Sequence, residues 1–300
     1  MKEEVVSFQS AGLRLHGVLG VPDGLPPSKR RAAFLVLHGF GSNCESQNVL
    51  APTRVLSEFG YVTLRFDMRG CGKSEGDFGR VICLEQVEDL GNALSFLARH
   101  PAVDPDRIGA IGSSFGGAVA VYAGGTNPQL AAVISNGGWG HGERKFRGQH
   151  ATPEAWAKFT KMLDDGRAYR GHTGESLMVP RYDIVPIPNH VRENLERQKV
   201  GMLAPNSVEV FPAETAQSMF DFRAEEVVGQ IAPRPLLLIH AANDSVTPTE
   251  QSIEMFKRAG QPTELHLFSG LDHFLFAENS KRVWGVLRGW LDTYFPAVAT

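Results

Sequence analysis

A strand pattern, a tight turn and a helix pattern follow one another over residues 107–123, and the turn reads Gly112-Ser113-Ser114-Phe115-Gly116-Gly117. Positions 112, 114 and 116 have the pattern G-x-S-x-G, whereas Ser113 lacks flanking glycines. A serine at the tip of a sharp strand-to-helix turn is held in strained backbone geometry, and side chains at the flanking positions would clash with the adjoining strand and helix. The pattern therefore predicts that the Ser114 hydroxyl projects from the sheet as a nucleophile.

The chain on both sides of this turn alternates between strand and helix patterns. Continuous apolar runs are typical of strands that are buried on both faces. Alternation with helices predicts right-handed crossovers and an α/β fold with a mostly parallel, doubly wound sheet, preceded by an antiparallel edge. The expected strands are residues 5–8, 13–19, 32–37, 61–66, 107–111, 131–135, 235–240 and 263–268, and the expected helices are 52–59, 84–99, 115–123, 249–259 and 278–294.

The alternation stops in the part of the chain that precedes the strand at 235–240. One helix is expected to begin at Thr152-Pro153, because threonine is a good N-cap and proline suits the first helical turn. A second helix is expected over 189–198. The stretch is too aromatic for a disordered linker. We therefore expect a core formed by residues 1–138 and 231–300, with a helical cap inserted over residues 139–230.

Two further residues are placed to assist Ser114. A serine hydroxyl needs a base within hydrogen-bond reach and a third group that orients the base. Asp244 and His273 each follow the end of an expected strand, and such ends meet at one edge of a parallel sheet. Asp272 is adjacent to His273, and neighbouring side chains rarely meet on one ring. The sequence therefore predicts that His273 is the base and that Asp244 orients it.

Attack on a carbonyl carbon produces an oxyanion, which needs fixed N–H donors. One donor is expected at Phe115, directly after the nucleophile. The other is expected in the loop His38-Gly39-Phe40-Gly41-Ser42, with the N–H of Phe40 as first choice and that of Gly41 as second. His38 is expected to support this loop by hydrogen bonding, because His273 is better placed for catalysis.

Basic and aromatic side chains gather in the expected cap. Arg144 and Arg147 are candidates to bind a substrate carboxylate, because guanidinium groups pair with carboxylates in planar two-point contacts. The alternative is a solvated charged surface on a cap helix. Trp139 and Trp156 either line an apolar pocket or pack the cap, and Gly41 is the remaining candidate for a substrate contact. An aromatic ester with a carboxylate, such as a phthalate monoester, fits this set.

Composition argues against several other classes of function. The 300 residues are 42% hydrophobic and 21% charged with a net charge of −3, which is ordinary for a soluble globular protein and does not favour nucleic acid or a membrane as partner. The N-terminus, MKEEVVSFQS, lacks the apolar stretch of a secretory signal, so a cytoplasmic location is expected. The sequence does not decide between a monomer and a homo-oligomer.

Neither a metal nor a cofactor is expected. The three cysteines show no CxxC spacing and the histidines no HExxH pattern. Gly72-Lys73-Ser74 imitates the end of a phosphate-binding loop, but Asp67 stands where that loop requires glycine. We expect instead a tight loop that Asp67 and Arg69 brace.

Taken together, these residues resemble the α/β-hydrolase family, in its branch of serine esterases and acyl-peptidases. The resemblance rests on His38–Gly41, Asp67–Gly76, Gly112–Gly117, Asp244 and His273, and covers the chain except about residues 140–230. It implies the chain order nucleophile, acid, histidine, an acyl-enzyme intermediate and a cap over the site. The aspartate nucleophile of dehalogenases and epoxide hydrolases is replaced by Ser114, which argues against those reactions.

The function expected from the sequence is therefore hydrolysis of a small carboxylic ester, with water as the second substrate. Two alternatives remain open. The same triad could cleave a thioester, an amide or a carbon–carbon bond, and a member of this fold could also bind ligands without catalysis.

Overall fold

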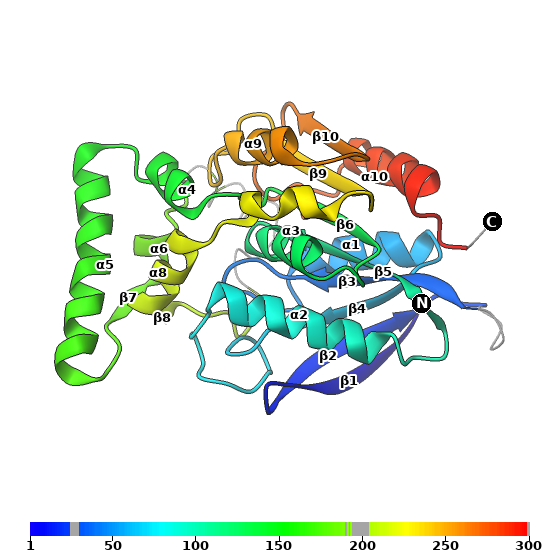
Figure 1. Ribbon diagram of the computed structural model, residues 1–300, viewed down its shortest axis with the longest axis horizontal. Coiled ribbons are helices and arrows are strands. Elements are labelled where there is room, and N and C mark those ends of the chain that lie inside the picture. The colour runs from blue at the N-terminus through cyan, green and yellow to red at the C-terminus, as the bar shows by residue number, and fades with distance from the viewer. Residues whose placement is uncertain (25–29, 190, 192, 194–203, 299–300) are drawn as a thin grey trace.

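The computed structural model describes residues 1–24, 30–189, 191, 193 and 204–298 (Figure 1). Its centre is an eight-stranded sheet in the order β1-β2-β4-β3-β5-β6-β9-β10. Strand β2 runs antiparallel to β1 and β4, and all other neighbouring strands are parallel, as the sequence predicts. The strands are β1 (Lys2–Ser10), β2 (Leu13–Val21), β3 (Arg31–Leu37), β4 (Val62–Phe66), β5 (Val103–Ser113), β6 (Ala132–Asn136), β9 (Leu236–Ala241) and β10 (Thr263–Phe268).

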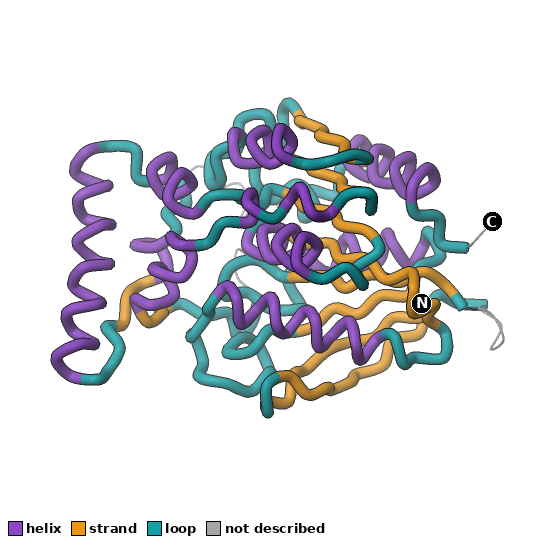
Figure 2. The backbone as a smooth tube through the Cα atoms, in the orientation of Figure 1, coloured by secondary structure: helices purple, strands orange, loops and turns teal. Residues whose placement is uncertain are grey.

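Helices cover both faces of this sheet, and the core is therefore split into two clusters. Successive residues of β3 point to opposite faces, so that Leu35 joins one cluster and Phe34 the other. The first face is covered by α2 (Cys83–Leu97), α3 (Phe115–Thr126) and α9 (Glu250–Arg258), and the second by α1 (Gln47–Glu58) and α10 (Lys281–Tyr294) (Figures 1 and 2). This confirms the predicted doubly wound α/β fold.

Helix α1 begins five residues earlier than the sequence pattern suggests, at Gln47. Pro52 was expected to start the helix but lies inside it. Proline has no N–H to donate to the carbonyl four residues earlier, which is that of Asn48. The Ser113 hydroxyl donates to this carbonyl instead, at 3.5 Å. Pro52 therefore leaves the Asn48 carbonyl available to accept a hydrogen bond from Ser113, the residue next to the predicted nucleophile.

Most elements between β6 and β9 lie at one side of the sheet, and we call them the inserted group (Figure 1). The last two elements, both short 3-10 helices, pack on α3 instead. Thr152 caps the longest helix of the inserted group as predicted, since its side chain accepts from the Ala155 N–H at 3.1 Å. The predicted helix over 189–198 falls mostly outside the described residues. The elements of the inserted group are α4 (Gly142–Gln149), α5 (Pro153–Thr173), β7 (Met178–Pro180), α6 (Arg181–Ile184), β8 (Val210–Pro212) and α8 (Ala213–Asp221). The two 3-10 helices that pack on α3 are η1 (Ala224–Glu226) and η2 (Val228–Ile231).

Candidate active site

Ser114 lies at the junction of β5 and α3 in a strained conformation, with φ 55° and ψ −114°. Non-glycine residues rarely adopt such angles. The residues two positions before and two positions after it must be glycines, for the steric reason that the sequence suggests. A Cβ on Gly112 would lie 2.2 Å from the Gly116 backbone in the helix, and a Cβ on Gly116 would lie 2.6 Å from the His38 carbonyl oxygen. The sharp turn therefore depends on both glycines, and Ser114 opens α3.

His273 and Asp244 meet as predicted. The Nδ1 atom of His273 lies 2.8 Å from Asp244 Oδ2, and both side chains are buried. Asp272, the rival acid, instead accepts from the Ser245 N–H at 2.9 Å and the Ser245 hydroxyl at 2.7 Å. Gly137 lies beneath the pair, because a Cβ there would approach the His273 ring to 3.4 Å.

A second histidine, which the sequence analysis did not identify, also contacts Asp244. His240 is the fifth residue of β9 and is fully buried, with its Nε2 atom 3.2 Å from Asp244 Oδ2. Nε2 also lies 3.0 Å from the carbonyl oxygen of Thr247, which can only accept. This nitrogen therefore carries a proton and donates toward both oxygens. Ser252 Oγ, 2.6 Å from Nδ1, occupies the other side of the ring.

Asp244 is held as a carboxylate. Burial raises its pKa, but the charge of His273 and the hydrogen bonds from both histidines outweigh burial and hold the pKa well below its ordinary value. The second oxygen, Oδ1, accepts from the backbone N–H groups of Val246 at 2.8 Å and Thr247 at 2.7 Å. The carboxylate is therefore ionised and fixed in orientation.

The loop after β3 passes beside Ser114. A Cβ on Gly39 would lie 3.9 Å from Ser114 Cβ, and Phe40 is the next residue along the chain. The Ser42 N–H donates to the Gly39 carbonyl at 3.1 Å and closes a turn in which Gly41 has φ +53°. His38 supports this loop as predicted: Nδ1 donates to the Gly39 carbonyl at 2.8 Å, and Nε2 accepts from the Met68 N–H at 3.2 Å.

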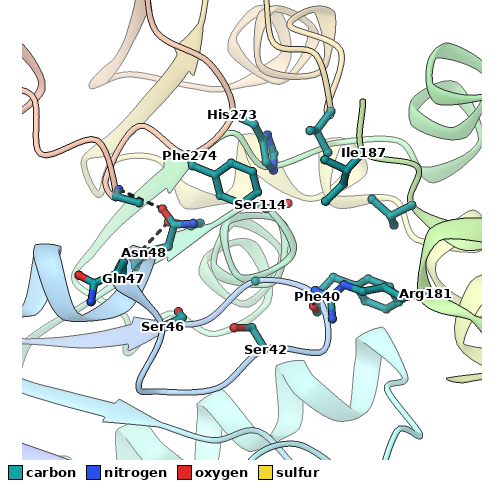
Figure 3. Close-up of a pocket in the computed structure, with 15 residues that line it drawn as sticks. Phe40, Ser42, Ser46, Gln47, Asn48, Ser114, Arg181, Ile187, His273 and Phe274 are labelled. Carbon is teal, nitrogen blue, oxygen red and sulfur yellow. Dashed lines mark hydrogen bonds between the residues drawn. The ribbon is translucent and has the colours of Figure 1, made fainter. Parts of the chain in front are cut away.

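A pocket with about 700 Å³ of space, part of it open to solvent, joins these elements (Figure 3). Ser114 and His273 both line it, although the structure records no hydrogen bond between these two described side chains. Such contacts often tighten only when substrate is bound. The other lining residues are Gly39, Phe40, Ser42, Ser46, Gln47, Asn48, Ser113, Arg181, Val185, Ile187, Val246, Phe274 and Ala277.

None of the five predicted substrate-contact residues lines this pocket. Arg144 instead forms a two-point ion pair with Glu225, whose side chain is 7% exposed. Arg147 pairs with Glu143 one helical turn away, at 3.0 Å, and lies over the Trp156 ring at 4.2 Å. Both guanidinium groups are therefore committed to partners within the protein, as is the face of Trp156.

Gly41 and Trp139 also have packing roles. A Cβ on Gly41 would lie 2.3 Å from the Phe211 ring, so this glycine allows close approach of two chain segments. Trp139 is 1% exposed and packs against Phe115 at a ring distance of 5.6 Å. Arg181, at the start of α6, is another residue that the sequence did not reveal, and it does line the pocket. The surrounding segment has no periodic pattern that could have singled it out.

The loop that imitates a phosphate-binding motif is structural, as predicted. Asp67 accepts from the backbone N–H groups of Cys44 at 2.7 Å and Lys73 at 2.8 Å, while Arg69 Nε donates to Asp89 at 2.8 Å. Metal-binding atom types of His16, Cys44 and Asp67 lie within 4.8 Å of one another, in the part of the chain that the structure describes. However, the Asp67 oxygens are already engaged, and burial raises the pKa of the Cys44 thiol, so the thiolate needed for a metal is disfavoured.

Among the described residues, every helix is too short or too polar to span a membrane.

The fold has close counterparts among solved structures. An α/β hydrolase of Penicillium sp. superposes with a TM-score of 0.79 at 22% identity, covering 98% of this chain and 99% of that one. A hypothetical protein of Pseudomonas aeruginosa gives 0.82 at 22% identity, covering 98% and 94%. Est1E of Butyrivibrio proteoclasticus, solved with ferulic acid bound, gives 0.66 at 18% identity, covering 96% and 98%. At these identities the likeness shows the fold.

Curated relatives match along most of their length. An uncharacterized 31.7 kDa protein of Escherichia coli is 25% identical over 275 residues, covering 90% of this chain and 92% of the relative. A polyketide transferase of Penicillium sp. is 26% identical over 269 residues, covering 87% and 86%. A thiohydrolase of Aspergillus aculeatus is 25% identical over 286 residues, covering 90% and 86%.

The family itself follows from a match over most of the chain. The family model described as serine aminopeptidase, S33, matches residues 28–280 of this chain. This range contains Ser114, Asp244 and His273. Together with the fold, this match shows that the chain belongs to the serine aminopeptidase S33 family of α/β hydrolases.

Proposed function

We propose that this protein is a serine hydrolase that cleaves a carboxylic ester through an acyl-enzyme. The observation that carries the proposal is that Ser114, at its strained turn, and His273, which contacts Asp244, line one pocket. Ser113 is the only other serine in the motif, and it does not compete for the role. It contacts the Asn48 carbonyl at 3.5 Å and the Asn136 amide at 3.3 Å.

The proposed reaction has two halves. His273 Nε2 takes the Ser114 proton as Oγ attacks the carbonyl carbon, and Asp244 stabilises the imidazolium through Nδ1. Backbone N–H groups of Phe40 and Phe115 hold the oxyanion. When the tetrahedral intermediate collapses, the carbon–oxygen bond to the alcohol breaks and His273 protonates the departing oxygen. Water, activated by His273, then attacks the acyl-enzyme and releases the acid.

The pocket favours an acyl group without a free amino terminus. An aminopeptidase must bind the ammonium group of its substrate, and this is best done by a carboxylate. None of the described residues that line the pocket is acidic. The apolar side of the pocket, formed by Val185, Ile187, Val246 and Phe274, suits an acyl chain or an aromatic ring. The phthalate monoester loses its support, because Arg144 and Arg147 do not line the pocket.

A second candidate is transfer or hydrolysis of a thioester. Relatives described as a polyketide transferase and a thiohydrolase favour it. The same serine would form the acyl-enzyme, and a thiol would depart in place of an alcohol. The two candidates differ in the leaving group and in the acceptor of the acyl group.

The central test is hydrolysis of a short-chain p-nitrophenyl ester by the wild type, Ser114→Ala and Ser113→Ala. Loss of the nucleophile is expected to lower kcat by several orders of magnitude, about 10⁶ in a well-studied serine protease, whereas Ser113→Ala is expected to keep most of the activity. Equal activity of wild type and Ser114→Ala would refute the proposal. An inactive wild type that is folded, tested also on a matched thioester, would favour a ligand-binding role.

A further inference from the structure

The loop that carries the proposed oxyanion donor Phe40 is held in place from the inserted group of elements. The Val208 N–H donates to the Gly41 carbonyl at 2.8 Å, and the Asn43 amide donates to the Pro205 carbonyl at 2.6 Å. Phe211 of β8 stacks on Phe40 with ring centres 4.3 Å apart. The loop therefore depends for its shape on a segment more than 160 residues away in the sequence.

Arg181 is the centre of these contacts. Its Nη2 donates to the Phe40 carbonyl, and its Nη1 donates to the carbonyls of Val208 at 2.8 Å and Gly41 at 3.4 Å. The guanidinium also lies over the Phe40 ring, 5.3 Å from its centre (Figure 3). The side chain is only 9% exposed, so these hydrogen bonds form away from bulk water and are strengthened by the low local dielectric.

These hydrogen bonds are made next to Gly41, the residue of the loop whose backbone angles are least restricted by its side chain. Gly41 has φ +53°, and glycine reaches many other backbone angles at little energetic expense. The Phe40–Gly41 peptide could therefore rotate, which would turn the N–H of Gly41, the second-choice oxyanion donor. The Phe40 N–H belongs to the preceding peptide, which is joined to this one at the Phe40 Cα. Arg181 donates hydrogen bonds to the carbonyl of the Phe40–Gly41 peptide and to the carbonyl of the next one. These bonds restrict the rotation of the Phe40–Gly41 peptide.

We propose that Arg181 is a positioning residue that orients the oxyanion loop, so that docking of the inserted group onto the sheet domain completes the oxyanion hole. The inference rests on the proposed function. The positive charge close to Phe40 also favours the developing oxyanion electrostatically. The two Nη atoms of the planar guanidinium donate to different carbonyls, those of Val208 and Phe40. Lysine can replace arginine only in part, because an ammonium group lacks this planar two-nitrogen geometry.

The experiment compares Arg181→Met and Arg181→Lys with Arg223→Met. Arg223 is the matched control, because its Nη1 donates to the carbonyls of Phe220 at 2.6 Å and Phe222 at 3.1 Å, within the same group of elements. Thermal unfolding establishes that each variant is folded. On the p-nitrophenyl ester we expect Arg181→Met to lower kcat about 10- to 100-fold with KM changed less than about threefold, and Arg181→Lys to recover part of the loss. Arg223→Met is expected to match the wild type.

A second readout separates this role from a merely structural one. An alkyl boronic acid that forms a tetrahedral adduct with Ser114 should lose affinity by the same factor as kcat, while the matched carboxylic acid product should bind unchanged. Equal losses for both ligands, or a rise in KM alone, would overturn the proposal in favour of simple docking. So would an unchanged kcat in folded Arg181→Met. If Arg181→Met does not fold, the same ligand comparison is decided with Arg181→Lys. Absence of esterase and thioesterase activity in the wild type would instead reject the proposed function.

Discussion

The carboxylate of Asp244 shows how single residues fix the charge and the orientation of the groups in this site. Both its oxygens are occupied, and His240 supplies a donor on the side of Oδ2 that His273 also contacts. Hydrogen bonds to a charged group contribute about 1.5–3 kcal/mol, and a buried carboxylate that loses one is left partly unsatisfied. His240 is thus a residue of the strand interior with an effect on the site.

Replacing His240 tests this effect. We expect His240→Leu to lower kcat/KM about tenfold, because Asp244 loses a donor that helps to hold its carboxylate toward His273. His240→Gln keeps an N–H in reach of Asp244 and is expected to retain most of the activity. Steady-state kinetics on the p-nitrophenyl ester measure both variants. Equal kinetics for wild type and a folded His240→Leu would show that His273 and the backbone donors suffice to orient Asp244.

The residues of the site divide into those that a sequence can reveal and those that it cannot. Ser114, Asp244 and His273 follow from glycine spacing and strand ends, since the topology of a parallel sheet brings strand ends together. His240 lies within an apolar strand, and its position in the sequence therefore indicates a core residue and not a residue of the site. The available signal was its polarity, because a fully buried histidine requires partners. Arg144 and Arg147 were misjudged because charge on a helix does not reveal which acid lies opposite.

Among the elements, α5 is the most independent of the site. It is the outermost helix of the inserted group (Figure 1), and only Phe159, Leu163 and Gly166 of its residues are buried. Its start at Thr152-Pro153 and its apolar side were both predictable, because capping and amphipathic periodicity are local. The segment around Arg181 and Val208 was not, because its position depends on distant contacts with the oxyanion loop.

Because α5 lies apart from the pocket, we expect Thr152→Ala to change stability and not activity. Loss of the N-cap hydrogen bond to Ala155 is expected to lower the free energy of unfolding by about 1 kcal/mol. The kinetic constants should stay at wild-type values, since no residue of α5 lines the pocket. Denaturant unfolding and steady-state kinetics give the two quantities. A marked fall in kcat at unchanged stability would mean that α5 communicates with Ser114.

At the scale of the whole molecule, the stability of the fold is coupled to a buried lysine in α4. Lys145 of α4 is 1% exposed and has no hydrogen-bond partner among the described residues. Its Nζ lies over the rings of Phe146 at 3.8 Å and Trp139 at 4.7 Å, contacts that would favour a charged lysine. Full burial opposes the charge more strongly and lowers the pKa well below its ordinary value.

A lysine that is neutral when folded and charged when unfolded makes stability depend on pH. The unfolded chain binds the extra proton at all pH values between the lowered folded pKa and the ordinary one near 10.4, so stability rises with pH across this window. We expect Lys145→Met to be more stable than the wild type at pH 7. This advantage should shrink by about 1.4 kcal/mol for each pH unit within that window. Denaturant unfolding at pH 7, 8 and 9 measures the difference.

Lys158→Met provides the control, because Lys158 is 73% exposed and pairs with Asp183 at 2.7 Å on the surface. Its difference from the wild type should not change with pH over the same range. If the difference for Lys145→Met were also independent of pH, Lys145 would be charged in the folded protein and held by Phe146 and Trp139. A pH-dependent difference would instead mean that Lys145 is neutral in the folded protein, so that the folded state gains stability as the solution becomes more basic.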